Sequence, residues 1–135
     1  MTKRHTIPVN LSESLITQLQ KALFYLKIEK SLPASLQNFF QFVCESFVQR
    51  DDIKAGFQAY LDGEKPPREP YKLMIIRIEP QLDAKFRTEL ARIIVERGEK
   101  VQIKDFFLWA TPHFLNSEKE MEGFRDFLVQ LSAKS

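Results

Sequence analysis

Few side chains in this chain have the types and spacing that catalysis or metal binding requires. The two histidines, His5 and His113, are far apart in the sequence, and His5 has no metal-ligating residue nearby. The single cysteine, Cys44, lies inside an apolar run, as expected of a buried thiol rather than a nucleophile. The sequence contains no glycine-rich phosphate loop and no recognisable pair of nucleophile and base. We therefore expect no enzymatic activity, no metal site and no cofactor.

Near the N-terminus, Lys3, Arg4 and His5 form a short basic arm. Such an arm is either a solvated chain end or a set of cations beside a nucleic-acid phosphate backbone. The net charge of +2 does not favour nucleic acid, because residues 1–65 carry 8 Lys or Arg against 7 Asp or Glu, and residues 66–135 carry 12 against 11. A nucleic-acid partner would therefore need a local basic patch.

Cysteine content and hydropathy indicate the compartment. A lone Cys44 cannot form an internal disulfide and suits a reducing environment. No apolar run approaches membrane-spanning length, and the N-terminal residues lack the apolar core of a signal peptide. We expect a cytoplasmic protein without a membrane partner.

A strand-to-helix junction that occurs twice is the element that must position any functional patch. Apolar and polar residues alternate over residues 6–11, the period of a half-buried strand, and Ser12 can then cap a helix. Residues 73–78 are apolar except for Arg77 and also lead into a helix, in which Pro80 stands early, where a missing amide costs least. Because neither short strand can satisfy its backbone alone, we expect the two to pair antiparallel within the chain.

The two halves of the sequence match at an offset of 67 residues, without insertion between Thr6 and Asp62. Identical pairs include Phe39 and Phe106, Phe40 and Phe107, Phe47 and Phe114, Gly56 and Gly123, and Phe57 and Phe124. This match defines repeat one (residues 6–62), a proline-rich linker (63–71) and repeat two (72–131). Since each half is small for a core of its own and the chain has twelve phenylalanines, we expect residues 1–135 to form a single pseudo-two-fold domain with one shared core. Six phenylalanines are expected to be buried around the pseudo-two-fold axis: Phe39, Phe40, Phe47, Phe106, Phe107 and Phe114.

Each repeat is expected to hold one strand and three helices, which makes the fold mainly α with a small β-ribbon. Helical periodicity predicts helices at residues 12–30, 36–48, 53–61, 80–97, from 102 onward, and 117–131. The helix at 36–48 is apolar on most sides, as expected of a central helix. Pro112 predicts that the helix from 102 is kinked or ends early. The glutamates at the last helix start are interpreted as a solvated first turn rather than a metal site: Glu118, Glu120 and Glu122.

The sequence Thr6-Ile-Pro-Val-Asn-Leu-Ser-Glu-Ser-Leu15, followed by the apolar helix after Ser35, resembles the ribbon-helix-helix family of Arc-, CopG- and MetJ-type repressors. In that family two copies pair their strands into an antiparallel ribbon that enters the DNA major groove. Two copies on one chain are similar to the single-chain tandem members among conjugative-plasmid proteins such as TraY. The resemblance leaves the third helix of each repeat unexplained.

The resemblance also implies which residues contact DNA. The residues implied to contact bases are those that alternate with the buried residues along each strand: Thr6, Pro8, Asn10, Leu73, Ile75 and Arg77. Among these, Asn10 and Arg77 can make bidentate contacts with adenine and guanine, whereas the apolar members offer at best a contact to a thymine methyl. Phosphate contacts fall to the start of the second helix of each repeat and to cations near the strands: Ser35, Leu36, Gln102, Ile103, Lys104, Lys3, Arg4 and Lys72.

Two functions remain open at this point. The first is a sequence-specific double-stranded DNA-binding protein, a repressor or an accessory factor of plasmid or other mobile DNA. The basic arm, Asn10 and Arg77 favour it. The second is a protein-interaction module that kept the fold and docks a protein partner, or another copy of itself, on an apolar ribbon. The balanced charge, Leu73 and Ile75 favour this alternative.

Overall fold

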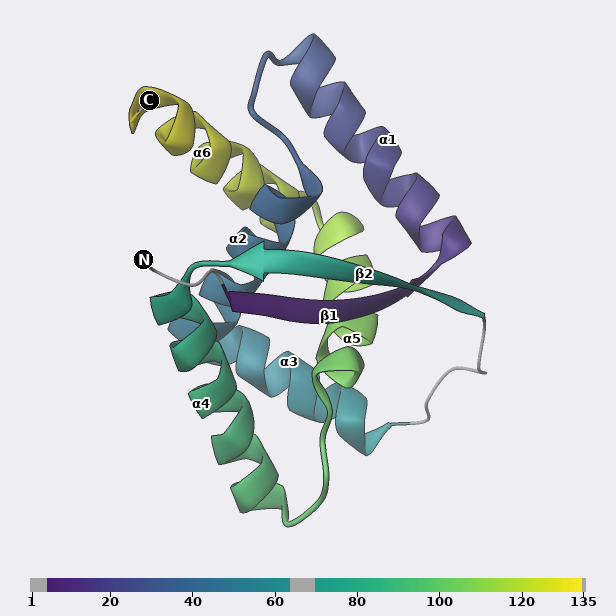
Figure 1. Cartoon of the computed structure of the whole chain (residues 1–135), viewed down its shortest axis with the longest axis vertical. Coiled ribbons are helices and arrows are strands. Elements are labelled where there is room, and N and C mark those ends of the chain that lie inside the picture. Colours follow the sequence, from purple (N-terminus) through teal and green to yellow (C-terminus); the bar gives the residue numbers. More distant parts are fainter. Residues whose placement is uncertain (1–4, 64–69, 135) are drawn as a thin grey trace.

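The computed structural model describes residues 5–63 and 70–134, and in this part of the chain two strands and six helices follow one another (Figure 1). A strand followed by three helices occurs twice in that order. The elements are β1 (His5–Ser12), α1 (Glu13–Glu29), α2 (Leu36–Gln49), α3 (Asp51–Asp62), β2 (Tyr71–Ile78), α4 (Pro80–Arg97), α5 (Ile103–Leu115) and α6 (Glu118–Lys134). The fold is mainly α with a small β-ribbon, as the sequence predicts.

Strands β1 and β2 form a two-stranded antiparallel ribbon, which confirms the predicted pairing within the chain. In this register Pro8 lies opposite Ile75 at the middle of the ribbon, and Thr6 lies opposite Arg77 toward one end. Since side chains alternate along a strand, the ribbon has an inner and an outer face. The inner face carries buried apolar residues: Ile7, Val9, Leu11, Ile76 and Ile78.

The core beneath the ribbon is built from phenylalanines of both halves of the chain. In the view of Figure 1 the ribbon lies in front of α2 and α5. Phe40 of α2 and Phe107 of α5 meet edge to face with their ring centroids 5.5 Å apart, and the centroids of Phe47 and Phe106 lie 4.7 Å apart. The predicted core phenylalanines are all buried: Phe39, Phe40, Phe47, Phe106, Phe107 and Phe114. Because these contacts join α2 to α5, the two halves share one core.

Local sequence signals explain where the helices begin and end. The Ser12 hydroxyl accepts a hydrogen bond from the Leu15 amide at 3.2 Å, and the Ser35 hydroxyl accepts one from the Asn38 amide at 3.1 Å, so each serine caps the helix that follows it. Pro80 is the first residue of α4. Helix α4 ends at Arg97 and is capped by Gly98, whose φ of 66° lies in the left-handed region that glycine adopts readily.

Helix α5 does not end early at Pro112, so that part of the sequence prediction is wrong. The helix continues to Leu115, three residues beyond the proline. An internal proline costs a helix about 3 kcal/mol through its missing amide and its ring. Here the last turn carries Phe114, which is fully buried between the halves and contacts the ring of Phe42. Burial of this side chain offsets the cost of the proline.

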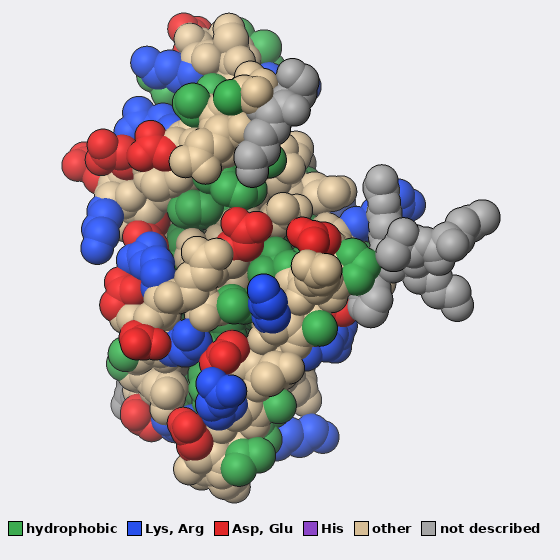
Figure 2. Space-filling view, turned by 90° about the vertical axis from the view of Figure 1, so that its left-hand side faces the viewer, with side chains coloured by type: hydrophobic (Ala, Val, Ile, Leu, Met, Phe, Trp, Pro, Cys, Tyr) green, Lys and Arg blue, Asp and Glu red, His purple; other side chains and the backbone are tan. Residues whose placement is uncertain are grey.

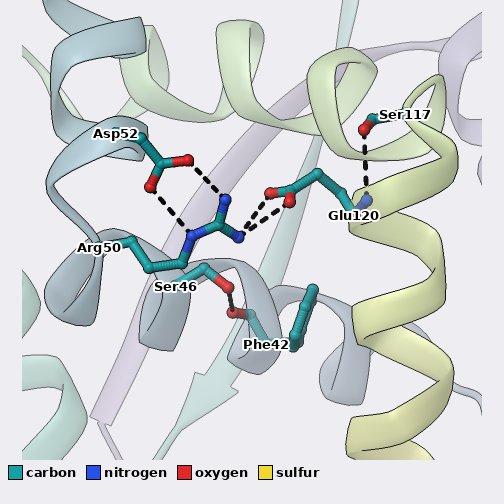
Figure 3. A network of polar contacts seen from close by, with 6 residues as sticks. All are labelled: Phe42, Ser46, Arg50, Asp52, Ser117 and Glu120. Atoms are coloured by element: carbon teal, nitrogen blue, oxygen red, sulfur yellow. Dashed lines mark hydrogen bonds and ion pairs between the residues drawn. The ribbon is translucent and has the colours of Figure 1, made fainter.

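Glu120 is not part of a solvated first turn, which corrects a second interpretation of the sequence. Its side chain is only 4% exposed and accepts two hydrogen bonds of 2.9 Å from Nη1 of Arg50 (Figure 3). Arg50 also donates to Asp52, with Nε–Oδ1 at 3.0 Å and Nη2–Oδ2 at 2.6 Å. This ion pair joins the α2–α3 corner of the first half to α6 of the second, because Arg50 lies between α2 and α3.

Candidate nucleic-acid interface

The outer face of the ribbon is the surface on which the predicted base-reading residues lie. Strand alternation places four residues of each strand on this face: Thr6, Pro8, Asn10 and Ser12 of β1, and Tyr71, Leu73, Ile75 and Arg77 of β2. All four residues of β2 are exposed, as are Thr6 and Pro8, whereas Asn10 and Ser12 are half-buried. The outward orientation expected for Arg77 therefore agrees with the structure, and Asn10 is partly covered.

The outer-face residues of the two strands form cross-strand pairs. Thr6 lies opposite Arg77, and Asn10 lies opposite Leu73. Directly opposite side chains of an antiparallel pair have their Cβ atoms about 5 Å apart, close enough to contact the same small group. The predicted readers Asn10 and Arg77 therefore belong to different pairs, on opposite sides of the middle pair of the ribbon.

Much of this outer face is apolar. Leu73 and Ile75 are each 59% exposed and Tyr71 is 41% exposed, and Pro8 lies beside Ile75. These side chains can make apolar contacts, but Leu73, Ile75 and Pro8 cannot hydrogen-bond to base edges. Direct polar readout from the outer face therefore depends on Thr6, Asn10, Arg77 and the two hydroxyl-bearing residues at the ribbon end.

A groove of about 470 Å³ lies beside Arg77. It is formed between the first turns of α2 and the junction of β2 with α4, and its lining residues are Gln37, Gln41, Arg77, Ile78, Glu79, Pro80 and Gln81. The groove therefore places the start of α2 next to the end of the ribbon that carries Arg77. The amides of Gln37 and Gln41 and the Arg77 guanidinium are donors available to an anion, and Glu79 is a charge that opposes one.

The start of α2 has the features expected of a phosphate contact. Ser35 is exposed, its hydroxyl is used as the helix cap, and the Asn38 side chain donates to the Pro33 carbonyl at 2.7 Å. The first turn contains no acidic residue. The Leu36 side chain is half-buried, and its amide belongs to the first helical turn, whose donors lack partners within the helix.

The start of α5 differs from that of α2. The Gln102 amide donates to Oδ2 of Asp105 at 2.9 Å, so a carboxylate of the chain itself occupies this helix start. Ile103 is half-buried, and Gln102 and Lys104 are exposed. A phosphate here would have to displace or lie beside the Asp105 carboxylate. The two predicted phosphate contacts are therefore unequal, and Lys104 is the better candidate at α5.

The remaining predicted cations fall into two groups. Lys72 is exposed but lies opposite Leu11, in register with the inner-face positions of the ribbon. It can reach a phosphate beside the ribbon but does not belong to the outer face. Lys3 and Arg4 lie outside the described residues. On the face that Figure 2 shows, Lys and Arg side chains are interspersed with Asp and Glu, in agreement with the balanced composition.

Arg87 of α4 is a ribbon neighbour that the sequence interpretation missed. Its Nη2 donates to the Thr6 carbonyl at 3.4 Å, and its Nε donates to Oδ1 of the buried Asp83 at 2.8 Å. The pair stands four residues apart on one helix face, a spacing that the sequence does display. The sequence alone does not show that this face of α4 lies against β1.

Three other features that could indicate a function are the cysteine, a metal site and a membrane-spanning helix. Cys44 is buried, and burial raises the pKa of its thiol far above the usual range, with the carboxylates of Asp83 and Glu45 raising it further. Within residues 5–63 and 70–134, no three His, Cys, Asp or Glu side chains are grouped so that they could hold a metal ion. In the same residues, no helix combines the length and apolar character needed to cross a bilayer.

Comparisons with family models, with curated proteins and with solved structures find no significant match to this chain. Its function must therefore be inferred from the geometry of the ribbon and of the elements around it.

Proposed function

We propose that the chain is a single-chain tandem ribbon-helix-helix protein, in which residues 6–62 and 72–131 are two copies of one unit. Reciprocal contacts support this proposal. The rings of Phe57 and Phe106 meet edge to face with centroids 5.3 Å apart, and those of Phe124 and Phe39 meet edge to face at 5.4 Å. Each residue of the second pair stands 67 positions from its counterpart in the first. At the same offset Pro8 corresponds to Ile75, its own partner in the ribbon, as a two-fold axis through that pair requires.

The function that this geometry supports best is sequence-specific binding of double-stranded DNA, as a repressor or as an accessory factor of plasmid or other mobile DNA in the cytoplasm. The observation that carries the proposal is an antiparallel ribbon whose outer face exposes Thr6 and Arg77 and also carries the half-buried Asn10. A two-stranded ribbon fits the DNA major groove, where each base pair presents a distinct pattern of donors and acceptors. Arg77 pairs well with guanine and Asn10 with adenine.

Phosphate contacts on both sides of the ribbon would fix its register on the duplex. In the view of Figure 1, α2 begins on one side of the ribbon and α5 on the other. The start of α2, at Ser35 and Leu36, offers free amides without a nearby acid in its first turn. On the other side the exposed Lys104 supplies the positive charge, because Asp105 already occupies the helix start. Contacts of this kind position a protein but carry no sequence information.

Binding to a random pool of duplex DNA, followed by selection of preferred sequences, tests the proposal. On the selected site Arg77→Ala should cost about 1–3 kcal/mol and relax the preference at one position. Lys104→Ala should weaken binding to all sequences alike and lower the salt slope by about one. Arg125→Ala is the matched control, because Arg125 is exposed on α6, a helix that packs mainly on α2 and α5 rather than on the ribbon. Binding that selects no sequence, or equal binding by wild type and Arg77→Ala, would count against base reading.

A protein partner is the second candidate, and the exposed Tyr71, Leu73 and Ile75 favour it. Exposed apolar side chains of this size, grouped on one strand, are typical of docking surfaces. If no salt-dependent DNA binding is found, this candidate takes precedence. Replacement of Leu73 and Ile75 by threonine should then abolish association with the protein partner, or self-association, without changing the fold.

A further inference from the structure

The two ends of the outer face carry different chemistry, although the register is symmetric about the middle pair, Pro8 and Ile75. The pair at one end, Thr6 and Arg77, is polar. The equivalent pair on the other side of the middle pair joins Asn10 to Leu73, and Ser12 and Tyr71 lie beyond it. Under the 67-residue offset Thr6 corresponds to Leu73 and Asn10 to Arg77, so each residue of one pair is replaced by a chemically different residue in the other.

We propose, resting on the DNA-binding function proposed above, that the ribbon reads a non-palindromic duplex, with a G·C pair at the Arg77 end and an A·T pair at the Asn10 end. Each cross-strand pair matches both bases of one base pair. The Arg77 guanidinium donates to O6 and N7 of guanine, and the Thr6 hydroxyl accepts from N4 of the paired cytosine. The Asn10 side-chain amide accepts a hydrogen bond from N6 of adenine through Oδ1 and donates one to N7 through Nδ2. Leu73 contacts the methyl group of the paired thymine.

The dimensions of the ribbon allow both contacts in one groove. Thr6 and Asn10 are four residues apart along β1, which spans about 13 Å at about 3.3 Å per residue. That length corresponds to about four base-pair steps of about 3.4 Å each. The two specified base pairs should therefore be separated by a short central segment. Pro8 and Ile75 lie over that segment and offer only apolar contact, so its readout should be limited to thymine methyl groups.

Exposure of the pairs is consistent with these roles. Arg77 and Thr6 are both exposed, and Leu73 is 59% exposed, so each can reach a base edge without rearrangement of the core. Asn10 is half-buried, so its amide has less freedom than the Arg77 side chain. The hydrogen bond from Arg87 to the Thr6 carbonyl, at 3.4 Å, joins α4 to the end of the ribbon that carries Thr6 and Arg77.

Sequence selection from a random duplex pool, repeated with substituted proteins, tests the proposal. Wild type should select a motif without two-fold symmetry. Arg77→Lys keeps the charge but replaces the planar fork of the guanidinium with a single ammonium group, so it should reduce discrimination at the G·C position alone, by up to about 150-fold. Asn10→Ala should do the same at the A·T position alone. The double variant Leu73→Thr/Arg77→Asn gives both ends the same residues and should select a more nearly palindromic motif.

The possible failures are distinguishable. A palindromic wild-type motif, or loss of preference at the same position in both single variants, would overturn the asymmetric readout and leave DNA binding intact. Recovery of no motif would overturn sequence-specific binding itself. Arg125→Lys serves as the control for the arginine substitution, and thermal denaturation of every variant shows whether it is folded. Because Arg77 is exposed, Arg77→Lys keeps the proposal falsifiable if the double variant fails to fold.

Discussion

The indole of Trp109 lies directly over Gly56, where an added Cβ would stand 2.8 Å from Cζ2 of the ring. The same relationship recurs between Phe42 and Gly123, where an added Cβ would stand 3.2 Å from Cζ of the ring. In each case an aromatic residue from the second helix of one half contacts a glycine in the third helix of the other half. The third helices, which the family resemblance left unexplained, are thus the elements that each half packs against its counterpart.

Gly56→Ala should therefore destabilise the protein, although alanine is ordinarily the better helix residue by about 1 kcal/mol. The indole cannot easily move, because it stacks on His113 at 4.7 Å and packs against Phe57 at 5.9 Å. Overpacking of a core typically costs about 1–3 kcal/mol, which exceeds the gain in helix propensity. Urea denaturation measures the change.

The control for this prediction is the double variant Gly56→Ala/Trp109→Phe. A smaller ring removes the close approach, so the two substitutions together should cost less than the sum of their separate effects. Gly123→Ala should be milder than Gly56→Ala, because the approach to Phe42 is longer. A stabilised Gly56→Ala protein would show that the indole has room to shift.

Elements set by neighbouring residues could be predicted from the sequence, whereas contacts between distant segments could not. Alternation in β1, the serine caps and Gly98 are local signals, and the structure places a strand, helix starts and a helix end where they predict them. The Arg50–Glu120 ion pair joins residues 70 positions apart, and the sequence around either residue does not predict which residue it contacts. The occupied start of α5 lies between these cases, because Gln102 and Asp105 have the spacing of a capping box, a local signal that the predicted phosphate contact did not take into account.

The candidate interface shows the same division. Strand alternation was sufficient to place Thr6 and Arg77 on the exposed side of the ribbon. The cross-strand partner of each residue depends on the register, which the sequence alone did not specify. Arg87 was missed because its contact with the Thr6 carbonyl depends on how α4 packs against β1.

Glu120→Gln should lower the free energy of unfolding by about 1–2 kcal/mol. Removal of one partner from a fully buried ion pair costs about 3–5 kcal/mol, and the cost is smaller here because Arg50 is 30% exposed and keeps its bonds to Asp52. Asp52→Asn, at the exposed end of the same network, should leave stability unchanged within error. Equal effects of the two substitutions in urea denaturation would contradict a special role for the buried carboxylate.

Stability should fall at alkaline pH because of Cys44. Burial, followed by the charges of Asp83 and Glu45, raises the pKa of the folded thiol, whereas the unfolded thiol ionises at about pH 8.5. The unfolded state therefore binds fewer protons above that pH, so the stabilisation is fully present below it and is lost as pH rises. Wild type should lose up to about 1.4 kcal/mol per pH unit more than Cys44→Ala over this range.

Comparison of slopes removes groups that both proteins share, including Tyr60, whose pKa burial also raises. The free energies of unfolding of wild type and Cys44→Ala, measured by urea denaturation at several values between pH 8 and 10, provide the slopes. Parallel slopes would mean that the thiol ionises in the folded protein. In that case a thiol reagent should also label the native chain, instead of reacting only on unfolding.

Thr111→Val should stabilise the protein by about 1 kcal/mol. The Thr111 hydroxyl is buried in α5 and has no hydrogen-bond partner among the described residues. An unsatisfied buried hydroxyl typically costs about 1–3 kcal/mol, and valine has nearly the same shape without the polar group.

Thr88→Val is the control, because it makes the same chemical change on α4, where the hydroxyl is exposed and donates to the Ala84 carbonyl at 2.8 Å. Its effect on the free energy of unfolding should stay within about 0.5 kcal/mol. A Thr111→Val protein that melts lower than Thr88→Val would show that the buried hydroxyl is satisfied after all, for example by an internal water molecule.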